Sequence, residues 1–144
     1  MKHDWEMRLA AAANGLHAAP AVIGPARTAA RRLNWRWFDL DLAGVRDKPG
    51  LLARCAARLA LPDYFGANWD ALAECLRDPV WLGAPGAVVW WHGGAEFARA
   101  AAADAVVAQE IFAEAARTWR GDARPFLVLI ERASVPDTPL AQLA

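Results

Sequence analysis

The chain has 144 residues, of which 56% are hydrophobic and 22% charged, a balance typical of one globular domain rather than an intrinsically disordered chain. No apolar run approaches the roughly eighteen residues that a membrane-spanning helix needs. Residues 1–36 have six basic and two acidic side chains and a net charge of +4, whereas residues 37–144 have ten basic and fourteen acidic ones and a net charge of −4. The acidic body argues against nucleic-acid binding and permits attraction to a basic partner.

The first 36 residues form a basic extension. Residues 4–13 are rich in alanine and are compatible with a helix that an Asn-Gly pair would end, and residues 21–23 could form a short strand. Single-stranded nucleic acid could be contacted by Arg27, Arg31 and Arg32 together with Trp35 and Trp37, although a solvated cationic linker is the preferred interpretation. We expect the extension to be either a loosely attached arm or a helix packed on the body.

Three short segments predict strands, at residues 37–42, 87–91 and 126–131. The first alternates apolar and polar residues, with Phe38, Leu40 and Leu42 on one face. The other two are continuous apolar runs, typical of strands that are covered on both faces. Long helical connections between them favour parallel pairing. The predicted fold class is therefore α/β, with a three-stranded parallel sheet flanked by helices.

Helical patterns fill the connections between the predicted strands. Asp47 can cap a helix whose buried stripe is Leu51, Leu52, Cys55 and Leu59. A second helix is predicted from about Asn68 to Leu76. A third begins near residue 95, and Asp104 can cap a longer helix that ends near residue 121.

The sequence offers little for catalysis. Ser134 is the only serine and lies in a proline-rich tail, the three histidines are scattered, and no spacing predicts a metal or cofactor site. Cys55 and Cys75 are too few for a disulfide framework, and the expected compartment is the cytoplasm. A small enzyme with one of these cysteines as its nucleophile is an alternative, but their apolar neighbours favour inert buried thiols.

The most informative segment is residues 61–76, Leu-Pro-Asp-Tyr-Phe-Gly-Ala-Asn-Trp-Asp-Ala-Leu-Ala-Glu-Cys-Leu. With Asn68 as N-cap, helical spacing gives Asp70 and Glu74 a common face. A separate apolar face then consists of Trp69, Leu72, Ala73 and Leu76. Because the segment contains no lysine or arginine, a basic partner could supply the missing positive charge.

Spacing alone favours a simpler interpretation of this segment. Asp70 would be stabilised by the helix dipole, and Glu74 could pair with Arg77 on a solvated face. By the same reasoning Tyr64 would cover the core or the surface, and Gly66 would adopt a turn conformation that is unfavourable for other residues.

Residues 61–76 resemble the signature of the barstar family, the intracellular inhibitors of barnase-type ribonucleases. A looser similarity runs from Phe38 to Glu131. The resemblance implies a small three-stranded parallel sheet with about four helices, and a non-enzymatic immunity protein that blocks a basic ribonuclease or a related toxin domain. It also implies a monomer when free, with no cofactor and no nucleic-acid or membrane partner. The expected organisation is a basic extension at residues 1–36, a barstar-like domain at residues 37–132 and a tail at residues 133–144.

In this family the helix and the loop before it plug the nuclease active site, and acidic side chains meet the basic residues that would hold RNA phosphate. The matching partner-binding positions are Tyr64, Gly66, Asn68, Trp69, Asp70, Ala73, Glu74 and Glu114. Glu74 stands where the best-studied member has an aspartate, Ala73 where tryptophan is common, and Trp69 where a smaller apolar residue is usual. These departures leave open an alternative, a barstar-fold module that binds a non-ribonuclease toxin or another protein.

Overall fold

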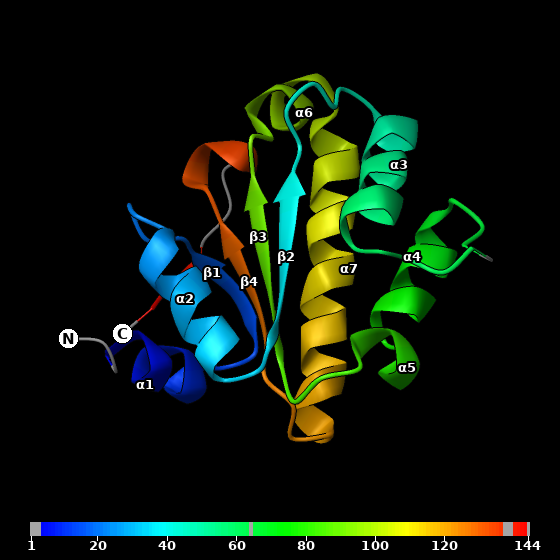
Figure 1. Ribbon diagram of the computed structural model, residues 1–144. Coiled ribbons are helices and arrows are strands. Elements are labelled where there is room, and N and C mark those ends of the chain that lie inside the picture. Colours follow the sequence, from blue (N-terminus) through cyan, green and yellow to red (C-terminus); the bar gives the residue numbers. More distant parts are fainter. Residues whose placement is uncertain (1–3, 64, 137–139, 144) are drawn as a thin grey trace.

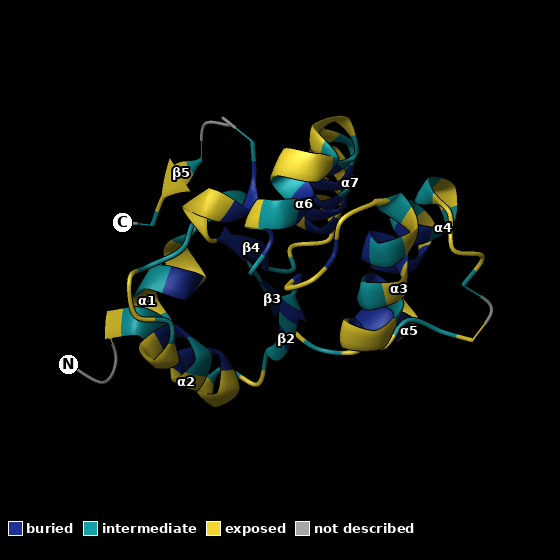
Figure 2. Ribbon diagram, turned by 90° about the horizontal axis from the view of Figure 1, so that it is seen from above, coloured by how far each residue is buried: buried dark blue, intermediate teal, exposed yellow. Residues whose placement is uncertain are grey.

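The computed structural model describes residues 4–63, 65–136 and 140–143, and its centre is a parallel sheet with helices on both faces (Figures 1 and 2). The strand order is β2-β3-β4-β1-β5, and every pairing is parallel. The strands are β1 Gly15–Ala18, β2 Arg36–Asp41, β3 Ala87–His92, β4 Phe126–Ile130 and β5 Ala141–Gln142. The helices are α1 Asp4–Ala11, α2 Gly24–Arg32, α3 Lys48–Arg58, α4 Trp69–Leu76, α5 Pro79–Leu82, α6 Ala95–Ala100, α7 Ala102–Gly121 and the 3-10 helix η1 Arg132–Ser134.

The α/β class and the three predicted parallel strands are confirmed, but the expected size of the fold is wrong. Among the described residues the sheet has five strands instead of three, and there are seven α-helices instead of about four. The additional strands β1 and β5 are short, four and two residues, and neither contains an apolar run. The strand considered for residues 21–23 is also wrong, because these residues lead directly into α2.

Alternate residues of the central strands face two separate cores. One core lies between the sheet and helices α3 to α7, and the strands contribute Phe38, Leu40, Val89, Trp91, Phe126, Val128 and Ile130 to it. The other lies between the sheet and helices α1 and α2, and contains Leu9, Ala26, Ala29, Ala30, Val88, Leu127 and Leu129. The continuous apolar sequences of β3 and β4 follow from burial on both faces.

The N-terminal segment is packed on the body, which is one of the two arrangements expected for it. Asn14 joins it to the rest of the chain, because its Nδ2 donates to the carbonyl oxygens of Ala116 and Arg124 at 3.0 and 2.8 Å. Its Oδ1 accepts a hydrogen bond from the backbone N of Phe126 at 3.0 Å. The amide of one side chain therefore fixes the start of β1 beside the start of β4 and the end of α7.

Side-chain caps position the helices on the other face of the sheet. Asp47 caps α3 as predicted, and its Oδ1 accepts from the backbone N of Gly50 at 2.8 Å. The predicted buried stripe of this helix is confirmed, since Leu51, Leu52, Cys55 and Leu59 are all buried. Asp104 lies inside the first turn of α7 rather than at its cap. No described helix has the combination of length and apolarity that spanning a membrane requires.

Candidate partner-binding site

Helix α4 begins as the sequence predicts. The side chain of Asn68 accepts a hydrogen bond from the backbone N of Ala71 at 2.8 Å, which satisfies one free donor of the first turn. The conformation expected of Gly66 is wrong: the left-handed residue in this loop is its neighbour Ala67, with φ of 51°. Gly66 is exposed, and a Cβ there would lie 3.3 Å from Nδ2 of Asn68. The loop and the cap are therefore packed closely together.

The inner face of α4 fixes the helix against the body. Leu72 and Leu76 are buried as predicted, Cys75 joins them, and Trp69 is half-buried against the same core. The indole Nε1 of Trp119 on α7 donates to the carbonyl oxygen of Leu76 at 2.8 Å. Because this bond satisfies a carbonyl at the C-terminal end of the helix, α4 is held at both ends.

The outer face of α4 carries the predicted pair of carboxylates. Asp70 and Glu74 are both exposed, and no ion pair joins either of them to a cation in the part of the chain that the structure describes. Arg77 does not pair with Glu74, because its Nε donates to the carbonyl oxygen of Ala73 at 3.1 Å. The negative charge of this face is therefore available to a partner.

These carboxylates line an open hollow of about 500 Å³, which we call the acidic hollow. Its lining is Lys48, Asn68, Trp69, Asp70, Ala71 and Glu74. The structure thus brings together four of the predicted contact residues and adds Lys48, whose Nζ lies 5.2 Å from the centre of the Trp69 ring. The sequence pattern could not identify Lys48, because it belongs to another helix, 21 positions before Trp69.

Three other predicted contact residues have different outcomes. Glu114, on the exposed side of α7, forms an ion pair with Arg117 of the same helix, with Oε2 at 2.5 Å from Nη2. It does not line the acidic hollow. Tyr64 lies outside the described residues. Ala73 is half-buried, and its small side chain leaves α4 without an aromatic contact at that position.

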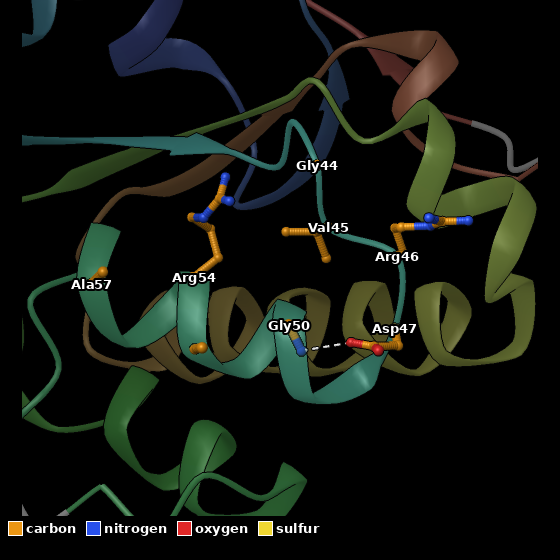
Figure 3. Close-up of a pocket in the computed structure, with 8 residues that line it drawn as sticks. Gly44, Val45, Arg46, Asp47, Gly50, Arg54 and Ala57 are labelled. Atoms are coloured by element: carbon orange, nitrogen blue, oxygen red, sulfur yellow. Dashed lines mark hydrogen bonds between the residues drawn. The ribbon is translucent and has the colours of Figure 1, made fainter.

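Two further hollows flank α3. The first, about 510 Å³, is mainly apolar and is lined by Lys48, Pro49, Leu52, Ala53, Ala56, Phe65 and Ala67. The second, about 400 Å³, lies between α3 and the loop after β2 (Figure 3). There Arg54 donates to the carbonyl oxygens of Asp41 and Ala43 at 2.5 and 3.1 Å, and Arg46 pairs with Glu96 at 2.9 Å. These arginines hold the loop in place.

The described residues offer no assembled catalytic group. Ser134 is buried and donates to Oε1 of Glu131 at 2.8 Å, whereas His92 pairs with Asp39. No group of three potential metal ligands occurs among the described residues.

Both cysteines are buried and unbonded. Burial raises the pKa of Cys55 to about 12, and burial, with the charges of Asp78 and Glu74, raises the pKa of Cys75. Because the reactive form of cysteine is the thiolate, these thiols are poorly suited to act as nucleophiles.

A family model described as Barstar (barnase inhibitor) matches residues 35–131, which is 97 of the 144 residues. The matched region begins just before β2, ends just after β4, and includes α4 with the acidic hollow. A search among curated proteins found no match.

Proposed function

Because the chain belongs to the barstar family, we propose that it is a protein inhibitor of a basic, barnase-type ribonuclease and blocks the active site of that enzyme with α4. The observation that carries this proposal is the exposed pair Asp70 and Glu74, on a helix capped at its start and anchored at its end, with no described cation paired to either. In the cell that makes the nuclease, such an inhibitor would serve as an immunity protein in the cytoplasm.

The chemistry of a ribonuclease active site suits this surface. A site that binds RNA phosphates is lined by cationic side chains, and carboxylates can take the place of the phosphates without being cleaved. Because α4 is already ordered, little conformational freedom remains to be lost on binding. Charge-assisted bonds to Asp70 and Glu74 would then form at the centre of the interface, where water is excluded.

The other predicted contacts have supporting roles in the proposed complex. Asn68 and Gly66 would present backbone groups to the nuclease, and Trp69 and Tyr64 would provide aromatic surface. Glu114 would have to exchange its bond with Arg117 for one with the nuclease, which makes it a weaker contact. We further propose that the free inhibitor is a monomer and that it has no enzymatic activity.

The test is inhibition of a barnase-type ribonuclease by the wild-type chain and by Asp70→Ala and Glu74→Ala. Each change should weaken binding by about 2–5 kcal/mol, because it leaves a cation of the nuclease buried without its partner. The free energy of unfolding of both variants should equal that of the wild type, since both side chains are exposed. Asp4→Asn is the charge-matched control, because Asp4 lies on α1, on the opposite face of the sheet (Figure 2). Wild-type inhibition by both α4 variants would refute the proposed binding face.

The second candidate partner is a basic toxin that is not a ribonuclease, or another basic protein. The presence of alanine at position 73 and of the large Trp69 beside Asp70 favours a partner surface shaped differently from that of barnase. Pull-down with the wild-type chain and with Asp70→Ala, from the cell that produces it, distinguishes the candidates. A partner that the variant loses and that does not cleave RNA would support the second candidate.

A further inference from the structure

Lys48 is a positively charged residue in the lining of the acidic hollow, beside the two carboxylates that are proposed to bind the cations of a partner. It is the first residue of α3 and lines both the acidic hollow and the mainly apolar hollow beside it. Its ammonium group lies 5.2 Å from the centre of the Trp69 ring, within the distance of a cation–π contact. The surface proposed to receive cations therefore already carries one of its own.

This position has two physical consequences. Tryptophan is the aromatic side chain that attracts cations most strongly, so the face of Trp69 would otherwise be a binding place for a lysine or arginine of a partner. Lys48 already covers that face. Its charge also opposes part of the field of Asp70 and Glu74, because charges across an open, hydrated hollow still interact at low ionic strength.

We propose that Lys48 is a specificity-determining residue of the acidic hollow: it excludes the cations of a partner from Trp69 and favours partners whose cations reach Asp70 and Glu74. The inference rests on the proposed function. Specificity is a difference between affinities, and a repulsive group on the binding surface lowers the affinity of unsuitable partners. A flexible polycation, which can place a charge anywhere in the hollow, should be rejected more strongly than a folded nuclease with fixed cations.

The experiment compares Lys48→Met with the wild-type chain. Methionine keeps an unbranched, slightly shorter side chain beside Trp69 and removes the ammonium group. Arg31→Met is the matched control, because it removes one positive charge from an exposed position on α2, across the sheet from α4 (Figure 1). Lys48→Arg keeps the charge and should behave as the wild type.

Two probes are used at an ionic strength of about 0.01 M, where the Debye length is about 30 Å. For a barnase-type ribonuclease, Lys48→Met should raise the association rate constant about two- to fivefold. For a tetra-arginine peptide, titrated against the backbone amide signals of α4, the dissociation constant should fall more, about five- to tenfold, because no positive charge of the chain then repels an arginine from Trp69. Both gains should nearly vanish at about 0.5 M salt.

The two probes separate the failure of the inference from the failure of the proposed function. If the wild-type chain does not bind the ribonuclease, the proposed function is wrong, and the peptide still tests Lys48. If Lys48→Met increases neither the association rate constant with the ribonuclease nor the affinity for the peptide more than Arg31→Met does, Lys48 does not compete for the hollow and the inference is wrong. Weaker binding by Lys48→Met would also overturn it, because Lys48 would then be a favourable contact.

Discussion

Replacing Asn14 by alanine should destabilise the whole fold, although this residue lies outside the region that matches the family model. The half-buried side chain makes three hydrogen bonds, with the carbonyl oxygens of Ala116 and Arg124 and with the backbone N of Phe126. At about 1 kcal/mol of net stability for each bond, with some replacement by water, the loss is about 2–3 kcal/mol. For a domain of this size that corresponds to a fall of about 6–9 °C in the thermal midpoint.

Urea denaturation followed by circular dichroism measures this loss, with Thr28→Ala on the exposed side of α2 as the control. Thr28→Ala should change the free energy of unfolding by less than about 0.5 kcal/mol. A change as small as that for Asn14→Ala would refute the reasoning, because the joint between β1, β4 and α7 would then contribute little. Limited proteolysis tests the predicted boundary at residue 36. If residues 1–36 form a separate unit, cleavage near residue 36 will remove them while strands β2, β3 and β4 stay folded.

Three other predictions concern the electrostatics, the thiols and the loop after β3. The association rate constant with the nuclease should fall steeply between about 0.05 and 0.5 M salt, because the Debye length shrinks from about 14 to 4 Å, while the dissociation rate constant changes little. Stopped-flow kinetics measures both rate constants. An association rate constant independent of salt would mean that the contact is mainly apolar. Because the pKa of buried Cys55 is raised from 9.0 to about 12, the stability that its neutral thiol contributes should be complete below pH 9 and decline from pH 9 toward 12. Cys55→Ala should remove that part of the pH dependence, and rapid labelling of either thiol in the native protein would revive the cysteine enzyme. Gly93→Ala should lower the free energy of unfolding by about 1–3 kcal/mol, because φ of Gly93 is 72° and a Cβ there would lie 2.7 Å from Oδ1 of Asp41. Urea denaturation measures this loss, and a variant as stable as the wild type would contradict that geometry.

The central strands and α3 and α4 were predictable because their signals are local. Alternation predicts a strand at residues 37–42, one position from the observed Arg36–Asp41, and a cap followed by apolar spacing identifies the start of α4 at Asn68. Strands β1 and β5 were missed because they are stabilised by pairing with distant neighbours, and their own residues carry no strand pattern. The N-terminal segment buries Val88 and Leu129, so deleting it would expose apolar surface of the sheet.

Prediction of the site divides in the same way. Helical spacing was sufficient to place Asp70 and Glu74 together. It could not show that Lys48 enters the same hollow, since that requires the relative placement of two helices. It also could not show that Arg117 engages Glu114 while Arg77 bonds to a backbone oxygen, because arginines have several donors and compete among nearby acceptors.

The position of β1 between β4 and β5 has a consequence for the order in which a newly made chain can fold. Asn14 is synthesised before its partner Phe126, which follows 112 residues later. At a synthesis rate of about 5–20 residues per second, the first strand waits roughly 6–22 s for its neighbour. During that interval α1 and α2 can cover Val88 of β3 but not Leu127 and Leu129 of β4. Premature termination before residue 126 would therefore release a fragment whose N-terminal third cannot complete its packing.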